Sequence, residues 1–274
     1  MPQLSKIEWT DYTWNPVTGC RKISPACKNC YAERIAERFR GVSNHPFQQG
    51  FDVKLWPERL EIPLRWRKPR RVFVNSMSDL FLEEVPGAFI EGVIRTMEKA
   101  NWHRFQVLTK RPKRMVKWIN DWIGKKNDWP GNVWLGVSIE SQDYMWRIDY
   151  LRQTPATVRF VSFEPLLDRI RLKSNSLEGI QWVIIGGESG ENARPMKRGW
   201  VEEIYTAAKK TGIPFFFKQW GTYNEAGLKV GKKNAGRIFK GCVWDEIPSW
   251  RPSKFRVLRP FTLKGKYSLW PSGK

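Results

Sequence analysis

The sequence predicts an α/β fold, a partial (β/α) barrel of parallel strands with an irregular basic C-terminal extension. Short β-rich apolar runs alternate with helical patterns from about residue 70 to residue 220, as in βαβ units that build a parallel sheet. The chain has 274 residues and is 41% hydrophobic, which is enough for one such domain with a substantial core. We expect the barrel to span residues 1–222 and the extension to span residues 223–274.

The apolar runs predict the strands of the sheet. Each run is short and rich in β-branched and aromatic residues, as buried strands are. The chain before residue 70 adds a possible first strand at Ile7–Thr13. The other predicted strands are Val72–Asn75, Phe105–Leu108, Val133–Val137, Val158–Ser162, Trp182–Ile185 and Phe215–Phe217.

Apolar residues at helical spacing lie between most of these strands. Phe89, Val93 and Met97 recur at i, i+4 and i+8, so they can cover the sheet from one face of a helix. Similar stripes occur in residues 115–123, 144–151 and 201–208, whereas the segment after Phe163 is less helical and predicts an irregular crossover.

The two ends of the chain are less regular. A helix is expected from about Asn29 to Arg40, and four prolines in residues 41–70 predict an irregular wrap. From Tyr223 to Lys274 the sequence has twelve Lys and Arg against three acids, with many Gly and Pro. This composition predicts an extended basic appendage.

The charge of the chain is strongly positive, with 48 Lys and Arg against 27 Asp and Glu and a formal net charge of +21. Such a charge indicates a nucleic-acid partner, because basic side chains gain affinity by releasing counterions from phosphates. It also fits a role in solubility alone. No stretch of 18 apolar residues occurs, and the first ten residues lack the apolar segment of a secretory signal, so we expect a cytoplasmic protein without a membrane span.

Three cysteines, Cys20, Cys27 and Cys30, lie within eleven residues. The two-residue gap between the last two lets both thiolates reach one metal, and disulfides are disfavoured in a reducing cytosol. A zinc site needs a fourth ligand, and neither His45 nor His103 has a familiar zinc spacing. An iron–sulfur cluster with three thiolates leaves one iron open for substrate or cofactor, so the cysteines favour a cluster and leave zinc as the alternative. The fourth cysteine, Cys242, is expected to be a spare thiol of the core, and a redox partner is the alternative.

Polar residues follow the predicted strands directly. In parallel barrels, functional side chains come from the carboxyl ends of the strands, so these residues form one candidate site. Each carboxylate also has the simpler interpretation of a helix cap or an ion-pair partner. The candidates are Asn75, Ser76, Asp79, Lys110, Glu140, Glu164, Gly186, Gly187, Glu188, Ser189, Arg194, Lys218 and Gln219.

Several stretches of the chain resemble a known family. They run from about Trp14 to Gly236 and include WNPVTGC, SPACKNCYAE, VFVNSMSDLF, VLTKRP, WLGVSIE, FVSFEPLL, IIGGESG, ARPM and PFFFKQWG. They look like the phage-associated three-cysteine family of unknown function, which is regarded as related to the radical S-adenosylmethionine enzymes.

The resemblance implies a [4Fe-4S] cluster at the three cysteines, with S-adenosyl-L-methionine on the open iron and an electron donor such as flavodoxin or ferredoxin. Reductive cleavage of the sulfonium then supplies a 5′-deoxyadenosyl radical. Two features depart from the common radical-enzyme pattern: six residues instead of three separate the first two cysteines, and the Gly-Gly-Glu step follows a late strand.

The preferred interpretation is a radical S-adenosylmethionine-like enzyme that modifies or repairs nucleic acid. We assign cofactor contacts to Asn75, Ser76, Asp79, Gly186, Gly187, Glu188, Ser189 and Arg194, and substrate or proton handling to Glu140, Glu164, Lys110, Lys218 and Gln219. Two alternatives stay open. One is a non-catalytic nucleic-acid-binding protein stapled by zinc or a cluster, and the other is a radical enzyme acting on a small molecule or a protein.

Overall fold

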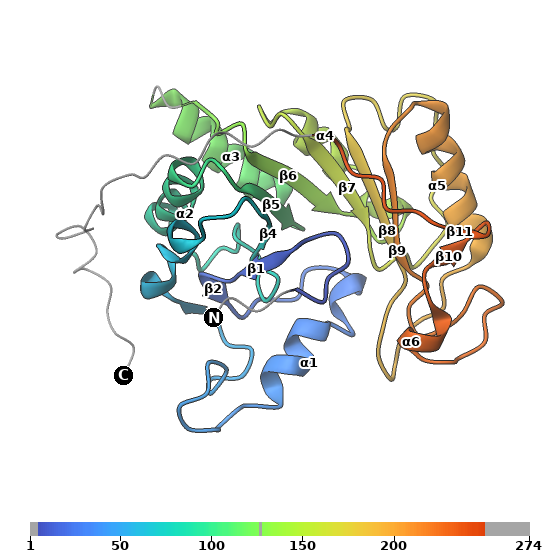
Figure 1. Cartoon of the computed structure of the whole chain (residues 1–274), viewed down its shortest axis with the longest axis horizontal. Helices are drawn as coiled ribbons and strands as arrows, with labels where there is room; N and C mark the ends of the chain where they lie inside the picture. The colour runs from blue at the N-terminus through green and yellow to red at the C-terminus, as the bar shows by residue number, and fades with distance from the viewer. Residues whose placement is uncertain (1–4, 126–127, 250–274) are drawn as a thin grey trace.

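A seven-stranded parallel sheet forms the centre of the molecule (Figure 1). The computed structural model describes residues 5–125 and 128–249. The strands are adjacent in the order β1-β4-β5-β6-β7-β8-β9, so the sheet is wound in one direction without a reversal. This is a partial α/β barrel, as predicted. Its strands are β1 Tyr12–Trp14, β4 Arg71–Val74, β5 Arg104–Thr109, β6 Val133–Ser138, β7 Arg159–Phe163, β8 Trp182–Gly186 and β9 Phe215–Gln219.

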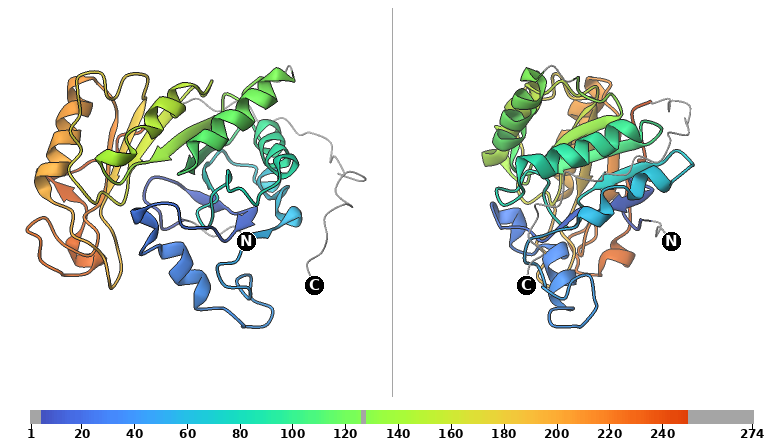
Figure 2. Two further views of the ribbon diagram at one scale, coloured as in Figure 1. Left: turned by 180° about the vertical axis from the view of Figure 1, so that it is seen from behind. Right: turned by 90° about the vertical axis from the view of Figure 1, so that its left-hand side faces the viewer.

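Helices cover the outer face of this sheet (Figure 2). They are α2 Gly87–Lys99, α3 Pro112–Gly124, α4 Arg147–Arg152 and α5 Arg198–Lys210, and the short helix η4 Gln142–Tyr144 precedes α4. Phe89, Val93 and Met97 of α2 are fully buried and share the main hydrophobic core with Val72 of β4 and Val107 of β5. The apolar stripe therefore packs on the sheet as the helical spacing predicts.

Aromatic side chains fill the amino-terminal part of the inner face. Successive strand residues point to opposite faces, and the inner-face residues Phe73, Trp134, Phe160 and Trp182 form a separate buried cluster with Trp9. The Trp9 and Trp182 rings meet edge to face at 6.1 Å. The N-terminal segment thus contributes a packed ring, and the first strand is Tyr12–Trp14 instead of the predicted 7–13. The carboxyl end of the inner face is here called the mouth.

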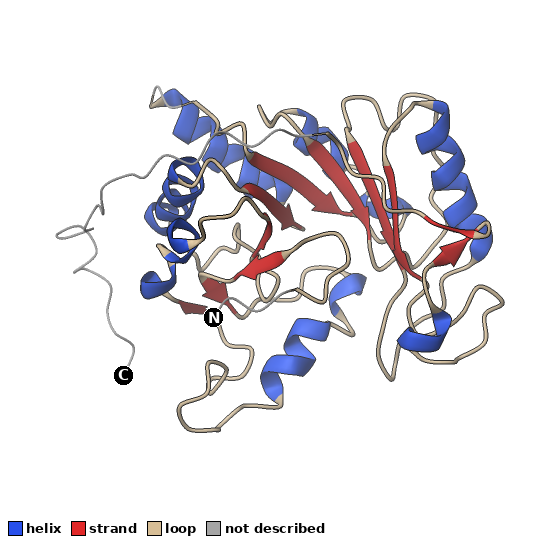
Figure 3. Cartoon of the chain, viewed as in Figure 1, coloured by secondary structure: helices blue, strands red, loops and turns tan. Residues whose placement is uncertain are grey.

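In the segment between β1 and β4, the part around α1 lies away from the outer helices (Figure 3), whereas the last part, near residue 62, contacts α2. It contains β2 Val17–Thr18, which pairs with β3 Lys54–Leu55, and the short helix η1 Pro25–Cys27 within the cysteine loop. Helix α1 follows at Tyr31–Glu37, shorter than predicted. The predicted wrap holds two short helices, η2 Pro57–Arg59 and η3 Ile62–Arg65.

Residues 223–249 pack against the last strand of the sheet. They form α6 Lys232–Ala235 and the hairpin of β10 Ile238–Phe239 with β11 Cys242–Val243. Phe239 is fully buried, and the amide of Phe217 donates a hydrogen bond to the carbonyl of Trp244. Residues 250–274 lie outside the described residues, so a separate extension at 223–274 stays a prediction. Cys242 is exposed, so the prediction that it is a buried thiol is wrong.

No helix in the described part of the chain combines the length and apolar character that a bilayer crossing requires.

Candidate metal centre and active site

The alternation of side chains along the strands brings polar residues to the mouth. Two residues beyond Trp134 and Phe160 the strands carry Gly136 and Ser162, and β8 ends in Gly186 on the same face, four residues beyond Trp182. A Cβ added to Gly136 would lie 2.4 Å from the Phe160 ring, and one added to Gly186 would lie 3.0 Å from Cδ of Glu164. The inner face is therefore closely packed below the mouth and polar at its rim.

The cysteine loop is tied to three strand ends around this mouth. The hydroxyl of Tyr31 donates to the carbonyl of Ser76, after β4, at 2.6 Å. Asn29 Nδ2 donates to Glu188 Oε2, after β8, at 3.0 Å. The third tie is Arg111 Nη2, after β5, which donates to the carbonyl of Arg21 at 2.9 Å. Residues 21–31 are thus held over the mouth from three sides.

The three cysteines of this loop are free and partly buried, and their surroundings differ. Burial raises the pKa of the Cys20 thiol to about 12, and the charge of Asp79 adds to this, while Arg111 opposes it. Burial also disfavours the Cys27 thiolate, but Lys110 and hydrogen bonds with the backbone of residues 23 and 24 lower its pKa below the ordinary value. Lys110 is therefore placed near two of the three sulfurs, as expected for a cation that faces thiolates.

The three thiols of the loop are donors of the kind that an iron–sulfur cluster takes. Within residues 5–125 and 128–249, no three His, Cys, Asp or Glu side chains converge on one point where a metal ion could bind. In a cluster, each thiolate binds a different iron, so the sulfurs need not meet at one point. His103, a candidate fourth zinc ligand, is fully buried with a ring nitrogen 3.1 Å from the carbonyl of Pro63. The soft, half-buried thiols beside Lys110 and Arg111 suit an anionic cluster.

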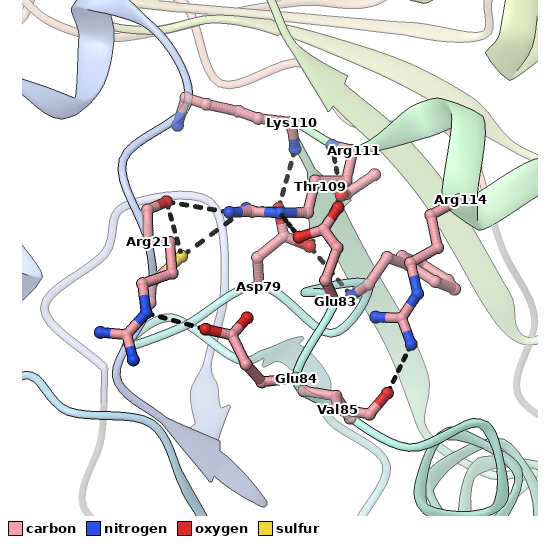
Figure 4. Close-up of polar contacts among 11 residues, drawn as sticks. Arg21, Asp79, Glu83, Glu84, Val85, Thr109, Lys110, Arg111 and Arg114 are labelled. Atoms are coloured by element: carbon pink, nitrogen blue, oxygen red, sulfur yellow. Dashed lines mark hydrogen bonds and ion pairs between the residues drawn. The ribbon is translucent and has the colours of Figure 1, made fainter.

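Asp79 organises the end of β5 (Figure 4). Its Oδ1 accepts hydrogen bonds from the Phe81 amide at 3.0 Å and the Thr109 hydroxyl at 2.7 Å. Its Oδ2 accepts from the Lys110 amide at 3.0 Å and from Arg111 at 3.2 Å. Both oxygens are thus engaged by protein donors, which makes Asp79 a support for its neighbours. Its contact with a cofactor stays a prediction.

Asn75 and Ser76 continue this support at the end of β4. Asn75 adopts a left-handed backbone conformation with φ of 60°, and its Oδ1 accepts from the Val17 amide at 3.3 Å. Its Nδ2 is buried without a hydrogen-bond partner among the described residues. Ser76 Oγ donates to Asn15 Oδ1 at 3.2 Å. An unpaired buried amide at the mouth is a candidate ligand contact, because such a group is costly unless something accepts from it.

The glycine-rich turn after β8 joins the cysteine loop to the last strand. A Cβ on Gly187 would lie 1.9 Å from the carbonyl oxygen of Trp220, so only glycine allows this close approach. Glu188 accepts from the amide and Nε of Arg194, both at 2.9 Å, and the pKa of Glu188 is lowered because these bonds and Asn29 outweigh burial. Gln219 Nε2 donates to the Gly187 carbonyl at 3.0 Å, and Ser189 Oγ donates to Gln219 Oε1 at 3.1 Å.

Two carboxylates after adjacent strands are each paired with a cation. Glu140 is fully buried and accepts from Arg147 at 2.8 Å, while its Oε1 has no partner among the described residues. Glu164 pairs with Lys218 of β9, and both side chains are less than one-fifth exposed, at 19% and 13%. Desolvation of its hydroxyl raises the pKa of Tyr31, as do the charges of Cys30 and Glu164 nearby. Glu164 therefore lies near the cysteine loop, and the chemical roles of the predicted acids and bases stay predictions.

Arg111 is also among the polar residues that follow the predicted strands, but no role is predicted for it from the sequence. The sequence shows it directly after Lys110, behind an apolar run, and that position was the available signal. Its side chain is only 4% exposed and reaches Cys20, 91 residues away in the sequence. Sequence patterns over a few neighbouring residues do not reveal such a long-range contact.

Comparison with known proteins gives one family match. A model of the family described as "Protein of unknown function (DUF5131)" matches residues 4–248. That description carries no phage association, so this part of the resemblance stays a prediction. No curated protein matches the sequence.

Solved structures of spore photoproduct lyase are similar to this chain at low identity. The lyase complexed with dinucleoside spore photoproduct gives a TM-score of 0.45 and 12% identity over 77% of this chain. A double mutant of the lyase with bound AdoMet and dinucleoside spore photoproduct gives the same values. In both comparisons the chain spans 64% of the length of the lyase.

Proposed function

We propose that this chain, which belongs to the DUF5131 family of proteins of unknown function, is an iron–sulfur enzyme of the radical S-adenosylmethionine type that modifies or repairs nucleic acid. The observation that carries the proposal is the position of the three-cysteine loop, which is bound to the ends of β4, β5 and β8 over a polar barrel mouth. Catalytic groups of parallel α/β barrels come from this end of the strands.

The chain's own residues provide the binding and shielding functions of such a site. Cys20, Cys27 and Cys30 would hold the cluster, which together with S-adenosylmethionine would supply a radical for hydrogen abstraction. Asn75 Nδ2 and Glu140 Oε1 are buried without partners among the described residues and are available to a polar ligand. The Glu164–Lys218 pair can hold or move a proton at the carboxylate, since it lies at the rim and remains partly accessible.

The charge of the chain supports a polymeric anionic substrate. Arg21, Lys22 and Lys28 are exposed on the cysteine loop itself, and the whole chain has a net charge of +21. Phosphates that bind these cations would bring a nucleotide to the mouth. Because the inner face is closed by aromatic packing below the rim, a base would have to leave its stack to reach the reacting atoms.

Anaerobic purification with iron and sulfide analysis tests the metal centre. We expect about four irons per chain, following the implied cluster, and visible absorbance that disappears in Cys20→Ser, Cys27→Ser and Cys30→Ser but persists in Cys242→Ser. Dithionite with S-adenosylmethionine should then yield 5′-deoxyadenosine. Stoichiometric zinc without iron would refute the enzymatic proposal and favour a metal-stapled binding protein.

Oligonucleotide binding separates a polymer substrate from a small molecule or a protein. We expect the affinity to fall steeply between low and physiological salt, because each neutralised phosphate adds to the salt dependence. An intact cluster that cleaves S-adenosylmethionine, without any oligonucleotide binding at low salt, would retain the radical chemistry and reject nucleic acid as the substrate.

A further inference from the structure

Arg111 is a buried cation whose whole guanidinium group is engaged at the edge of the cysteine loop (Figure 4). Nη1 contacts Cys20 Sγ at 3.7 Å and Asp79 Oδ2 at 3.2 Å. Nη2 donates to the Arg21 carbonyl at 2.9 Å, and Nε donates to Glu83 Oε2 at 2.9 Å. One side chain therefore links the sulfur, the backbone after the first cysteine and two carboxylates.

The orientation of this guanidinium is fixed by its own strand end. The Arg111 amide donates to Thr109 Oγ1 at 2.8 Å, and the Thr109 hydroxyl donates to Asp79 at 2.7 Å. Asp79 in turn accepts from Arg111 itself. The arginine thus sits in a closed set of hydrogen bonds in which both the charge and the planar fork of donors are used.

We infer that Arg111 is a positioning residue that donates a hydrogen bond to the Cys20 thiolate and raises the reduction potential of the cluster held by the three cysteines. This inference rests on the proposed function. Hydrogen bonds to ligating sulfurs and nearby charge are among the factors that set cluster potentials. A cation 3.7 Å from one thiolate and 96% buried stabilises the reduced, more negative cluster, because screening by water is weak at this site.

The effect of Arg111 is on the one-electron reduction of the cluster by an external reductant. No bond is made or broken in this step. Removal of the positive charge leaves the Asp79 carboxylate, 8% exposed, beside Cys20. The loss of the positive charge and the uncompensated negative charge of Asp79 both disfavour the addition of an electron to the cluster. Arg111→Met should therefore lower the equilibrium constant for cluster reduction at least tenfold, which is about 59 mV in a one-electron potential.

Arg114 offers a matched control. It lies in the first turn of α3, three residues after Arg111, which precedes the helix. It is close enough to the charges of Asp79 and Glu83 to be affected by them, and it donates to the Val85 carbonyl at 2.5 Å. It makes no hydrogen bond to a cysteine in the described part of the chain. Arg114→Met removes an equal charge from the same part of the chain, so a general loss of positive charge would shift both variants alike.

An anaerobic redox titration followed by electron paramagnetic resonance measures the midpoint potential in the full chain. We expect equal iron content in wild type, Arg111→Met and Arg114→Met, with the negative shift confined to Arg111→Met. Arg111→Lys keeps the charge without the planar fork and should give an intermediate shift, and it serves as the test if Arg111→Met does not fold.

The failures of the two proposals are distinguishable. If the wild type holds a cluster and the Arg111 variants titrate at its potential, or shift no more than Arg114→Met, Arg111 has only a structural role and the inference is wrong. If the wild type holds no iron, the proposed function fails and the inference fails with it.

Discussion

The buried Glu140–Arg147 ion pair gives the sharpest test of how the rim is built. Glu140→Gln removes the charge of a carboxylate that is 0% exposed and leaves Arg147, 1% exposed, with its positive charge uncompensated. Arg147 Nη1 keeps its bond to the Ser138 carbonyl at 2.7 Å, but a neutral amide does not balance the buried guanidinium. Breaking a buried pair on one side costs about 3–5 kcal/mol, a large part of the stability of a typical domain.

The assay is equilibrium urea unfolding, in which the midpoint should fall while the denaturant slope is unchanged. Asp149→Asn is the matched control on the same helix, because Asp149 pairs with Arg152 at the same 2.8 Å but is 67% exposed. Its loss should cost less than about 1 kcal/mol. Replacing both buried partners by apolar residues, as in Glu140→Leu with Arg147→Met, should recover most of the loss. Equal effects of Glu140→Gln and Asp149→Asn would refute the reasoning.

Three further predictions concern single residues. In metal-free protein at pH 8, iodoacetamide should label Cys27 well before Cys20, because the pKa of Cys27 is lowered and that of Cys20 is raised to about 12; mass spectrometry that finds Cys20 labelled first would contradict this. Burial lowers the pKa of His103 to about 4. Between about pH 6.5 and pH 4 the imidazole is therefore protonated in the unfolded chain but not in the folded one. The free energy of unfolding should fall by about 3 kcal/mol as the pH drops from 6.5 to 4. His103→Gln should flatten that part of the pH dependence, and an unchanged profile would exclude His103 as its source. Gly136→Ala should destabilise the chain by about 1–3 kcal/mol, because the added Cβ would lie 2.4 Å from the Phe160 ring. Gly131→Ala is the control, since the nearest atom to its Cβ is 3.9 Å away, and it should change the thermal midpoint little. Similar losses of stability in the two variants would show that the clash at Gly136 is relieved.

The sheet was predictable because its strands are short apolar runs that end in polar residues. Val133–Ser138 and Trp182–Gly186 begin at the predicted residues, and the irregular crossover after Phe163 is observed. Burial on both faces produces such uninterrupted runs. The first strand was placed too early because Trp9 looks like a strand residue, although it packs across the inner face against Trp182.

The parts that the sequence did not predict depend on contacts between distant residues. Phe239 and Trp244 join the core through β9, but they lie in a segment whose Gly, Pro and Lys content indicates an extended chain. The hydrogen bond from Asn29 to Glu188 crosses 159 positions. Local periodicity reports which face a residue occupies, and it contains no information on which distant partner completes a hydrogen bond.

The acids of the rim are already neutralised by the chain itself, and this limits what each can do. Glu140 pairs with Arg147, Glu164 with Lys218, and Glu188 with Arg194. Hydrogen bonds from Arg194 and Asn29 lower the pKa of Glu188, so this carboxylate is a poor proton donor at neutral pH.

Glu164 and Lys218 form the pair most open to rearrangement, because both are partly exposed, whereas Glu140 is fully buried and Glu188 is held by four hydrogen bonds. Lys110 differs from these cations, because in the described part of the chain its ammonium makes no hydrogen bond or ion pair and lies near the Cys20 and Cys27 sulfurs. The charge left for an incoming anion at the mouth is thus positive and lies beside the cysteines, which is where a negatively charged cluster with its bound cofactor would need it.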